Sequence, residues 1–171
     1  MPHITLESLY DANAKLVYWA VFSVLHDHDL TQDAVQNTFL SAHRNMEMLG
    51  TLSDAQCRAW LYRCAVNSGI DILRRQKRNV LTENAGENEA DTAVGPEEAA
   101  EQGELRRFIH DLVHKLPKKY RDPLYLYYFA ELDYHQIANI LQLNEGTLKS
   151  RMSRGRAMLE ARLKKEGGVY G

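Results

Sequence analysis

The 171-residue chain has no long apolar run and only two cysteines. Its apolar runs are far too short to cross a bilayer, and the N-terminus lacks a basic segment that is followed by an apolar stretch. We therefore expect no membrane insertion, no signal peptide and a cytoplasmic location. Cys57 and Cys64 occur seven residues apart in a helical pattern, so their Cα atoms should be about 10 Å apart. That is too far for a disulfide, and we expect two buried thiols.

Motifs of common catalytic and metal sites are also missing. The sequence has no glycine-rich phosphate loop, nucleophile motif or paired-carboxylate pattern. His110 and His114 lie one helical turn apart, and His26 and His28 flank Asp27. Because no spacing supplies a third and a fourth ligand to either pair, we expect no metal site. We also expect no cofactor and no enzymatic activity.

A formal net charge of −2 conceals three segments of strong local charge. Residues 58–78 contain six basic residues and one acid, and residues 145–165 contain seven basic residues and two acids. Between them, residues 83–104 contain eight acids and no base. The net charge is therefore a poor guide to local fields, and it does not exclude a polyanionic partner.

Hydrophobic residues recur with the 3.6-residue period of α-helices, and no segment has a convincing strand pattern. The N-terminal part predicts helices over residues 6–25, 32–49 and 54–78. Thr31 is the expected N-cap of the second helix, and Ser53 or Asp54 that of the third. Met46 should lie on the inner face of the second helix, which Gly50 should end.

Residues 79–104 are acidic and free of aromatic side chains, which is the composition of a linker that cannot bury a core. The chain should therefore consist of an N-terminal helical domain over 1–79, a linker over 80–104, a C-terminal helical domain over 105–166 and a tail over 167–171. The expected fold class is all-α, with two small helical domains joined by a flexible acidic linker.

The pattern of the C-terminal part predicts two helices followed along the chain by a helix-turn-helix. Pro123 either kinks the second of these helices, or Asp122 and Pro123 start it. Asp133 begins the next helix with a capping-box pattern, and Asn144 is the expected N-cap of the last one. Gln142 stands where such turns often place a left-handed glycine, at a cost of about 1 kcal/mol.

The last helix divides into an apolar seam and a basic edge. The seam consists of Leu148, Met152, Gly155 and Leu159. The residues expected to bind DNA are Thr147, Lys149, Ser150, Arg151, Arg154 and Arg156. Hydroxyls and arginines of a recognition helix reach base edges, while further bases hold phosphates. The alternative is a surface helix with solvated cations, but the capped preceding helix and the short turn favour DNA recognition.

Two other faces suggest binding surfaces. The long helix carries a stripe opposite its apolar side, made of Trp60, Arg63, Asn67, Asp71, Arg74 and Arg78. An aromatic ring, an amide and guanidiniums suit unstacked bases flanked by phosphates, although Trp60 packed on a neighbouring helix would fit the pattern slightly better. The second helix presents a cation-poor face of Asp33, Gln36, Asn37 and Leu40. This face indicates either a protein contact or a plain solvated surface.

These features together resemble the extracytoplasmic-function (ECF) sigma factors, which are promoter-specificity subunits of bacterial RNA polymerase in the sigma-70 family. The segment DAVQNTFLSAHR at 33–44 resembles the polymerase-binding helix of the family, and WLYRCAVNSGIDILRR at 60–75 resembles its promoter-melting helix. Residues 116–159 resemble its C-terminal helix-turn-helix domain. The ordered set covers nearly the whole chain apart from the linker, and it is highly specific.

The resemblance implies a role for each face. Core polymerase would bind Asp33, Gln36, Asn37 and Leu40 through the clamp helices of its large subunit. The −10 element would be bound and melted by Trp60, Arg63, Asn67, Arg74, Arg75 and Arg78, with a flipped base held by Asn67. The −35 element would be read by the basic edge of the last helix. The family also implies an anti-sigma factor as partner and a stress or envelope response.

Three positions depart from the pattern of the family. Asn37 replaces the usual acid, His43 replaces the usual aromatic residue, and Gln142 replaces a frequent glycine. The loop over residues 48–56 also differs, so the −10 base preference of the family does not transfer. The alternative function is a helix-turn-helix regulator that acts without polymerase. It explains the C-terminal domain but leaves the two N-terminal faces without a role.

Overall fold

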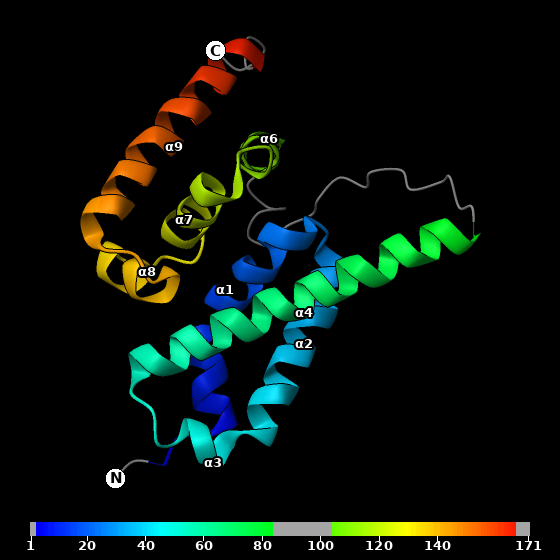
Figure 1. The fold of residues 1–171 in the computed structure, drawn as a ribbon, viewed down its shortest axis with the longest axis vertical. Helices are drawn as coiled ribbons and strands as arrows, with labels where there is room; N and C mark the ends of the chain where they lie inside the picture. The colour runs from blue at the N-terminus through cyan, green and yellow to red at the C-terminus, as the bar shows by residue number, and fades with distance from the viewer. Residues whose placement is uncertain (1–2, 84–103, 167–171) are drawn as a thin grey trace. The chain divides into compact units, whose positions relative to one another are not determined.

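The computed structural model describes residues 3–83 and 104–166 (Figure 1). Within these ranges the chain forms eight helices and no strand, which confirms the all-α prediction. Contacts group the chain into two compact units, residues 1–92 and 93–171. Most of the predicted linker over 80–104 lies outside the described residues.

The N-terminal unit is built from three packed helices and one short turn of helix. These elements are α1 (Leu6–Leu25), α2 (His28–Arg44), α3 (Met46–Leu49) and α4 (Asp54–Glu83). The helices α1, α2 and α4 pack against one another and enclose one core (Figure 1). Val17, Phe22 and Leu61 are fully buried in it.

The break between α1 and α2 is shorter than the sequence predicted. His26 ends α1 in a left-handed conformation with φ 51°, and α2 begins two residues later at His28. The carboxylate of Asp27 accepts a hydrogen bond from the Leu30 N–H at 2.9 Å. The prediction of Thr31 as N-cap is therefore wrong: Asp27 caps the helix four residues earlier, and Thr31 is fully buried inside it.

The second predicted helix is in fact two elements. It ends at Arg44 rather than next to Gly50, and Asn45, with φ −116° and ψ 21°, separates it from the four-residue α3. The Asn45 side chain donates to the Ser41 carbonyl at 2.7 Å, which is the local competition that makes asparagine unfavourable inside helices. As a result Met46 is only half-buried.

The start of α4 follows one of the two predicted caps. The Ser53 hydroxyl accepts from the Gln56 N–H at 3.2 Å, and the Gln56 side-chain carbonyl accepts from the Ser53 N–H at 3.0 Å. This reciprocal pair is a capping box. The helix then continues to Glu83, five residues beyond the predicted end at Arg78.

The C-terminal unit contains the remaining four helices. They are α6 (Glu104–His114), α7 (Lys118–Tyr128), α8 (Tyr134–Leu141) and α9 (Glu145–Glu166). The helix α9 packs against α6, α7 and α8. Leu112, Leu124, Ile137, Leu148 and Met152 form the centre of the core and are almost fully buried.

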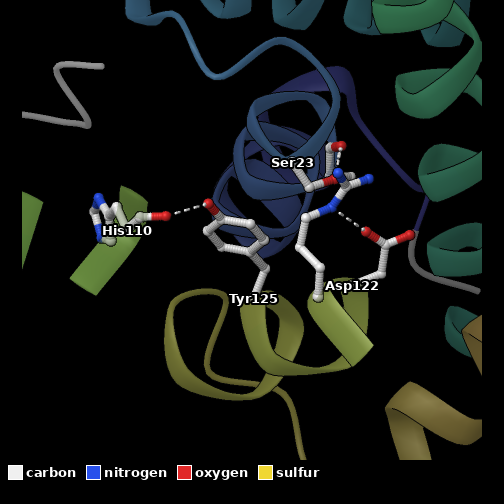
Figure 2. A network of polar contacts seen from close by, with 6 residues as sticks. Ser23, His110, Asp122 and Tyr125 are labelled. Carbon is white, nitrogen blue, oxygen red and sulfur yellow. Dashed lines mark hydrogen bonds and ion pairs between the residues drawn. The ribbon is translucent and has the colours of Figure 1, made fainter. Parts of the chain in front are cut away.

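A buried tyrosine ties α6 to α7. The Tyr125 hydroxyl donates to the His110 backbone carbonyl at 3.2 Å (Figure 2). Burial raises the pKa of Tyr125 well above its ordinary value, so the phenol remains a donor at any physiological pH. The hydrogen bond therefore joins the two helices inside the core.

The helix α7 begins earlier than the Asp122 start that the sequence left open. It starts at Lys118, after Pro117, whose carbonyl accepts from the N–H groups of Tyr120 and Arg121. Pro123 consequently lies inside the helix. Asp122 is buried and accepts from the Arg121 Nε at 3.2 Å (Figure 2), so it serves as the partner of a neighbouring guanidinium instead of a cap.

The predicted helix-turn-helix is present, with residues 142–144 between α8 and α9. Asp133 and Gln136 form the expected capping box at the start of α8. Asn144 accepts from the Thr147 N–H at 2.7 Å at the start of α9. Gln142 adopts the expected left-handed conformation, with φ 56° and ψ 47°.

We predict that Gln142→Gly stabilises the C-terminal unit by about 0.5–1 kcal/mol, because relief of the left-handed strain exceeds the entropy that glycine loses on folding. The free energy of unfolding can be measured by urea titration of the α9 amide signals in NMR spectra. The control Asn139→Gly, at an exposed right-handed position of α8, should lower it by a few tenths of a kcal/mol. Equal effects of the two substitutions would contradict the prediction.

Candidate nucleic-acid and protein-binding surfaces

The apolar seam of α9 faces the core, as predicted. Leu148 and Met152 are fully buried, Gly155 is buried, and Leu159 is half-buried. A Cβ atom on Gly155 would lie 3.3 Å from the Leu124 Cδ1 atom, so the glycine allows a close approach of α7 and α9. This packing fixes which side of α9 faces away from the core.

The outward side of α9 carries five of the six predicted DNA-binding residues, which we call the reading edge. They are Thr147, Lys149, Ser150, Arg151 and Arg154. Lys149, Ser150 and Arg154 are exposed, and the other two are half-buried. Three cations and two hydroxyls therefore lie on the side of the helix that does not pack against the unit. Their contact with DNA stays a prediction.

Arg156, the sixth predicted residue, lies in a different environment. Its Nε donates to the Tyr128 hydroxyl at 2.8 Å, and its Nη2 donates to the Tyr134 hydroxyl at 2.9 Å. The guanidinium carbon also lies 5.7 Å from the ring centroid of Tyr127. The two hydrogen bonds raise the pKa of Arg156. The sequence did not predict this site, because the two hydroxyls come from α7 and α8, more than twenty residues away.

The predicted stripe on α4 points away from the core. Leu61 and Ala65 are fully buried on the opposite side of the helix. A Cβ atom on Gly69 would lie 3.3 Å from the Val24 Cβ atom of α1. The exposed residues of the stripe are Arg63, Asn67, Asp71, Arg74 and Arg78, with Arg75 exposed beside them and Trp60 half-buried. The stripe therefore presents an amide, a carboxylate and three guanidiniums to solvent along one helix, with the guanidinium of Arg75 beside them.

The predicted face of α2 is exposed along its whole length. Asp33, Gln36 and Asn37 are exposed, and Leu40 leaves 53% of its surface open to solvent. The residues between them pack into the core, where the Thr38 hydroxyl donates to the Ala34 carbonyl at 2.8 Å. The face is polar and cation-poor, with one protruding aliphatic side chain at its end.

An exposed aromatic ring adjoins the helix that carries this face, and the sequence did not predict its exposure. Tyr10 of α1 directly follows the buried Leu9, but 49% of its surface is exposed. Its ring centroid lies 4.9 Å from that of Phe39 on α2. Periodicity alone could not show this exposure, because the exposure of a side chain on α1 depends on how α2 packs against that helix.

The C-terminal unit contains an apolar cavity of about 440 Å³ between α6, α7 and α9. Its lining residues are Leu105, Ile109, Val113, Leu124, Tyr128, Phe129 and Leu159. Leu105 and Tyr128 each expose half of their surface. Leu105 lies one turn before Ile109 on α6, and the structure leaves this end of the cavity lining open to solvent.

The two cysteines differ in burial. Cys57 is buried, and its thiol donates to the Leu49 carbonyl at 3.4 Å; burial also raises its pKa. Cys64 is free and only half-buried, so the prediction of two buried thiols holds for one of them.

In residues 3–83 and 104–166, no group of three histidine, cysteine or acidic side chains lies close enough to hold a metal ion. No helix there has the length and apolar character of a membrane span.

Comparisons with known proteins match both units. The family model "Sigma-70 region 2" matches residues 9–79, and the model "Sigma-70, region 4" matches residues 107–159. The ECF RNA polymerase sigma factor SigM of Bacillus subtilis is 28% identical over 92% of this chain and 94% of its own length. The RNA polymerase sigma-H factor of Pseudomonas aeruginosa is 32% identical over 81% of this chain and 76% of its own.

Two solved structures have a similar fold. The sigma factor RpoE of Bartonella quintana, in complex with the anti-sigma factor NepR, has a TM-score of 0.68 and 25% identity over 92% of this chain and 95% of that one. CnrH, in complex with the cytosolic domain of CnrY, has a TM-score of 0.62 over 94% of this chain and 88% of that one. At 21% identity, CnrH supports the fold alone. Because two sigma-70 family models match most of the chain and the curated relatives include ECF sigma factors, the protein belongs to the ECF sigma factors of the sigma-70 family.

Proposed function

We propose that this alternative sigma factor binds core RNA polymerase through α2, melts the −10 element with α4 and reads the −35 element with α9. The observation that carries the proposal is the presence of two exposed cationic surfaces in separate units, the α4 stripe and the reading edge. A helix-turn-helix regulator that acts alone would need only the C-terminal unit. The match of a sigma-70 region to each unit does not favour that alternative.

The α4 stripe suits a melted strand better than an intact duplex. Flipping a base out of the stack costs a few kcal/mol, so melting requires a group that captures the flipped base. The Asn67 amide both donates and accepts hydrogen bonds, as the edge of a base does. Arg63, Arg74 and Arg78 are exposed on the same stripe, where they can neutralise phosphates of the opening strand.

The reading edge suits an intact major groove. Arginine pairs with the O6 and N7 atoms of guanine, and hydroxyls reach either bases or phosphates. Arg156 is the exception among the predicted residues, because its hydrogen bonds to Tyr128 and Tyr134 hold it against α7 and α8. We assign Arg156 to the support of α9 and leave base contact to Arg151 and Arg154.

The α2 face suits a protein partner. Asp33 gives it negative charge, and Leu40 provides an aliphatic group that a partner can bury. By analogy with the family, the partner is the clamp of the polymerase large subunit, which places the protein in the cytoplasm. The similar sigma factor RpoE was solved in complex with an anti-sigma factor, NepR. We therefore propose that an anti-sigma factor holds this chain inactive until a stress or envelope signal releases it.

The proposed function needs binding and no bond chemistry. The protein would act as an initiation factor that positions polymerase and captures bases, without a metal ion or cofactor of its own. Its formal net charge of −2 fits this role, because a strongly basic chain would bind DNA without polymerase and compete with its own holoenzyme.

We predict that Asn67→Ala leaves core binding unchanged and lowers the amount of open complex about tenfold, because the flipped base loses its hydrogen bonds. The measurement is permanganate reactivity of the −10 thymines in the reconstituted holoenzyme. Gln76→Ala is the control: it removes the same amide from an exposed position on the opposite side of the same helix. Unchanged reactivity in Asn67→Ala, or an equal loss in Gln76→Ala, would contradict the assignment.

We predict that Leu40→Asp weakens the affinity for core polymerase about 10- to 100-fold, because it loses the burial of an aliphatic side chain and places a charge in the interface. The affinity can be measured with a fluorescently labelled sigma factor. Met48→Asp changes another exposed apolar residue of the same unit, one that belongs to α3 and not to α2, and should retain wild-type affinity. Wild-type affinity in Leu40→Asp, with the fold intact by circular dichroism, would exclude α2 as the docking helix.

A further inference from the structure

Three tyrosine side chains contact the guanidinium of Arg156, and we call them the tyrosine cluster. They are Tyr127 and Tyr128 in the last turn of α7, and Tyr134, the first residue of α8. The Tyr128 and Tyr134 hydroxyls accept from the Nε and Nη2 atoms of Arg156 at 2.8 and 2.9 Å. The guanidinium carbon lies 5.7 Å from the ring centroids of both Tyr127 and Tyr128, which is within the range of a cation–π contact.

The three rings of the cluster also pack on one another. The ring centroid of Tyr127 lies 4.9 Å from that of Tyr128, with the ring planes at 88°. It lies 5.3 Å from that of Tyr134, with the planes at 71°. Edge-to-face pairs at these separations are favourable. Ring packing therefore holds the two hydroxyl acceptors in place, in addition to their hydrogen bonds with Arg156.

The hydrogen bonds of Arg156 connect all three helices of this region. The turn at residues 142–144 joins α9 to the C-terminal end of α8, and Arg156 joins α9 to Tyr134 at the other end. The eight residues of α8 separate these two attachments by about 12 Å. Because α8 is attached at both ends, it cannot rotate against α9 without breaking the bond to Tyr134.

Arg156 lies on the side of α9 that is turned away from the arginines of the reading edge. At 100° per residue, it is about 140° from Arg151 and about 160° from Arg154 around the helix axis. Any rotation of α9 about its axis turns all three residues through the same angle. The bonds that hold Arg156 therefore also set the direction in which Arg151 and Arg154 point.

We propose that Arg156 and its two acceptors, Tyr128 and Tyr134, are positioning residues that orient the recognition helix before DNA binds. They touch no base or phosphate themselves, and they act through Arg151 and Arg154. A helix that is already oriented loses less entropy on contact with the −35 element, so the fixed orientation favours the sequence that fits it. This inference rests on the proposed function, since it requires α9 to be the recognition helix.

The geometry of the guanidinium separates this role from a phosphate contact. Its planar fork has donors in fixed directions, so it can hold two hydroxyls from two helices at once, whereas the ammonium of lysine is a point charge. A phosphate accepts either cation. Arg156→Lys therefore keeps a phosphate contact but loses the double bond to Tyr128 and Tyr134.

The test measures the affinity of the holoenzyme for promoter fragments with a preferred and with a scrambled −35 element. A library with a randomised −35 element first defines the preferred sequence. The double variant Tyr128→Phe/Tyr134→Phe removes both acceptors and leaves every cation of the chain in place. We expect it to reduce the ratio of the two affinities about tenfold, which is the effect of one hydrogen bond to a charged group. Arg156→Lys should reduce the ratio to a similar extent.

Matched variants separate positioning from stability and from charge. All affinities are measured at a temperature at which circular dichroism shows each variant fully folded, so a loss of stability alone leaves the ratio unchanged. Tyr127→Phe changes the neighbouring hydroxyl and keeps the ring beside Arg156, and it should behave as wild type. Lys149→Ala should lower the slope of log affinity against log salt by about 0.9, the value for one phosphate contact. Arg156→Ala should leave that slope unchanged.

The outcomes distinguish this inference from the proposed function. An unchanged ratio in the double tyrosine variant, while Arg154→Ala alters the preferred sequence, would overturn the positioning role and leave the recognition helix in place. Wild-type behaviour of Arg156→Lys, together with a lower salt slope in Arg156→Ala, would also overturn it, because Arg156 would then be a phosphate contact. If neither Arg151→Ala nor Arg154→Ala alters the preferred sequence, the proposed function of α9 fails together with the inference.

Discussion

The burial of one side of each long helix is the constraint on which the rest of the molecule depends. In α4, Leu61 and Ala65 must face α1 and α2, so the residues on the other side of a 3.6-residue period must face solvent. In α9, Leu148 and Met152 impose the same division. The cationic surfaces are therefore not independent features, because the cores of the two small units orient them.

Glycine and tyrosine then refine the C-terminal surface beyond what a helical wheel describes. Gly155 lets α7 approach α9 closely, since a Cβ atom at this position would lie 3.4 Å from the Tyr120 Cβ atom. Tyr128 and Tyr134 draw Arg156 toward α7 and α8. Two arginines of equal charge thus have different surroundings: Arg154 is exposed on the reading edge, and Arg156 joins α9 to α7 and α8. The separation of the two roles that we propose, base contact and support of α9, follows from the hydroxyl contacts of Arg156.

The sequence predicted what depends on local interactions and missed what depends on distant ones. The capping box at Asp133, the cap at Asn144 and the left-handed Gln142 were predictable, because each involves residues within four positions. Thr31 was wrongly chosen as a cap, because Asp27 and Thr31 stand close together and both are residue types that cap helices. Only packing against the core, which buries Thr31, decides between them. The environment of Arg156 could not be predicted, because its partners come from other helices. The family was visible from the order of three short motifs, even though each motif alone left an alternative open.

The central claim is that the two units work together on polymerase and not as separate DNA-binding modules. Transcription in vitro with purified protein and core polymerase, on a genomic fragment library, tests it most directly. The account predicts RNA starts at specific promoters only when both components are present, with a shared −35 and −10 sequence upstream of each start. Specific duplex binding by the chain alone, without association with core and without promoter-specific RNA, would contradict it.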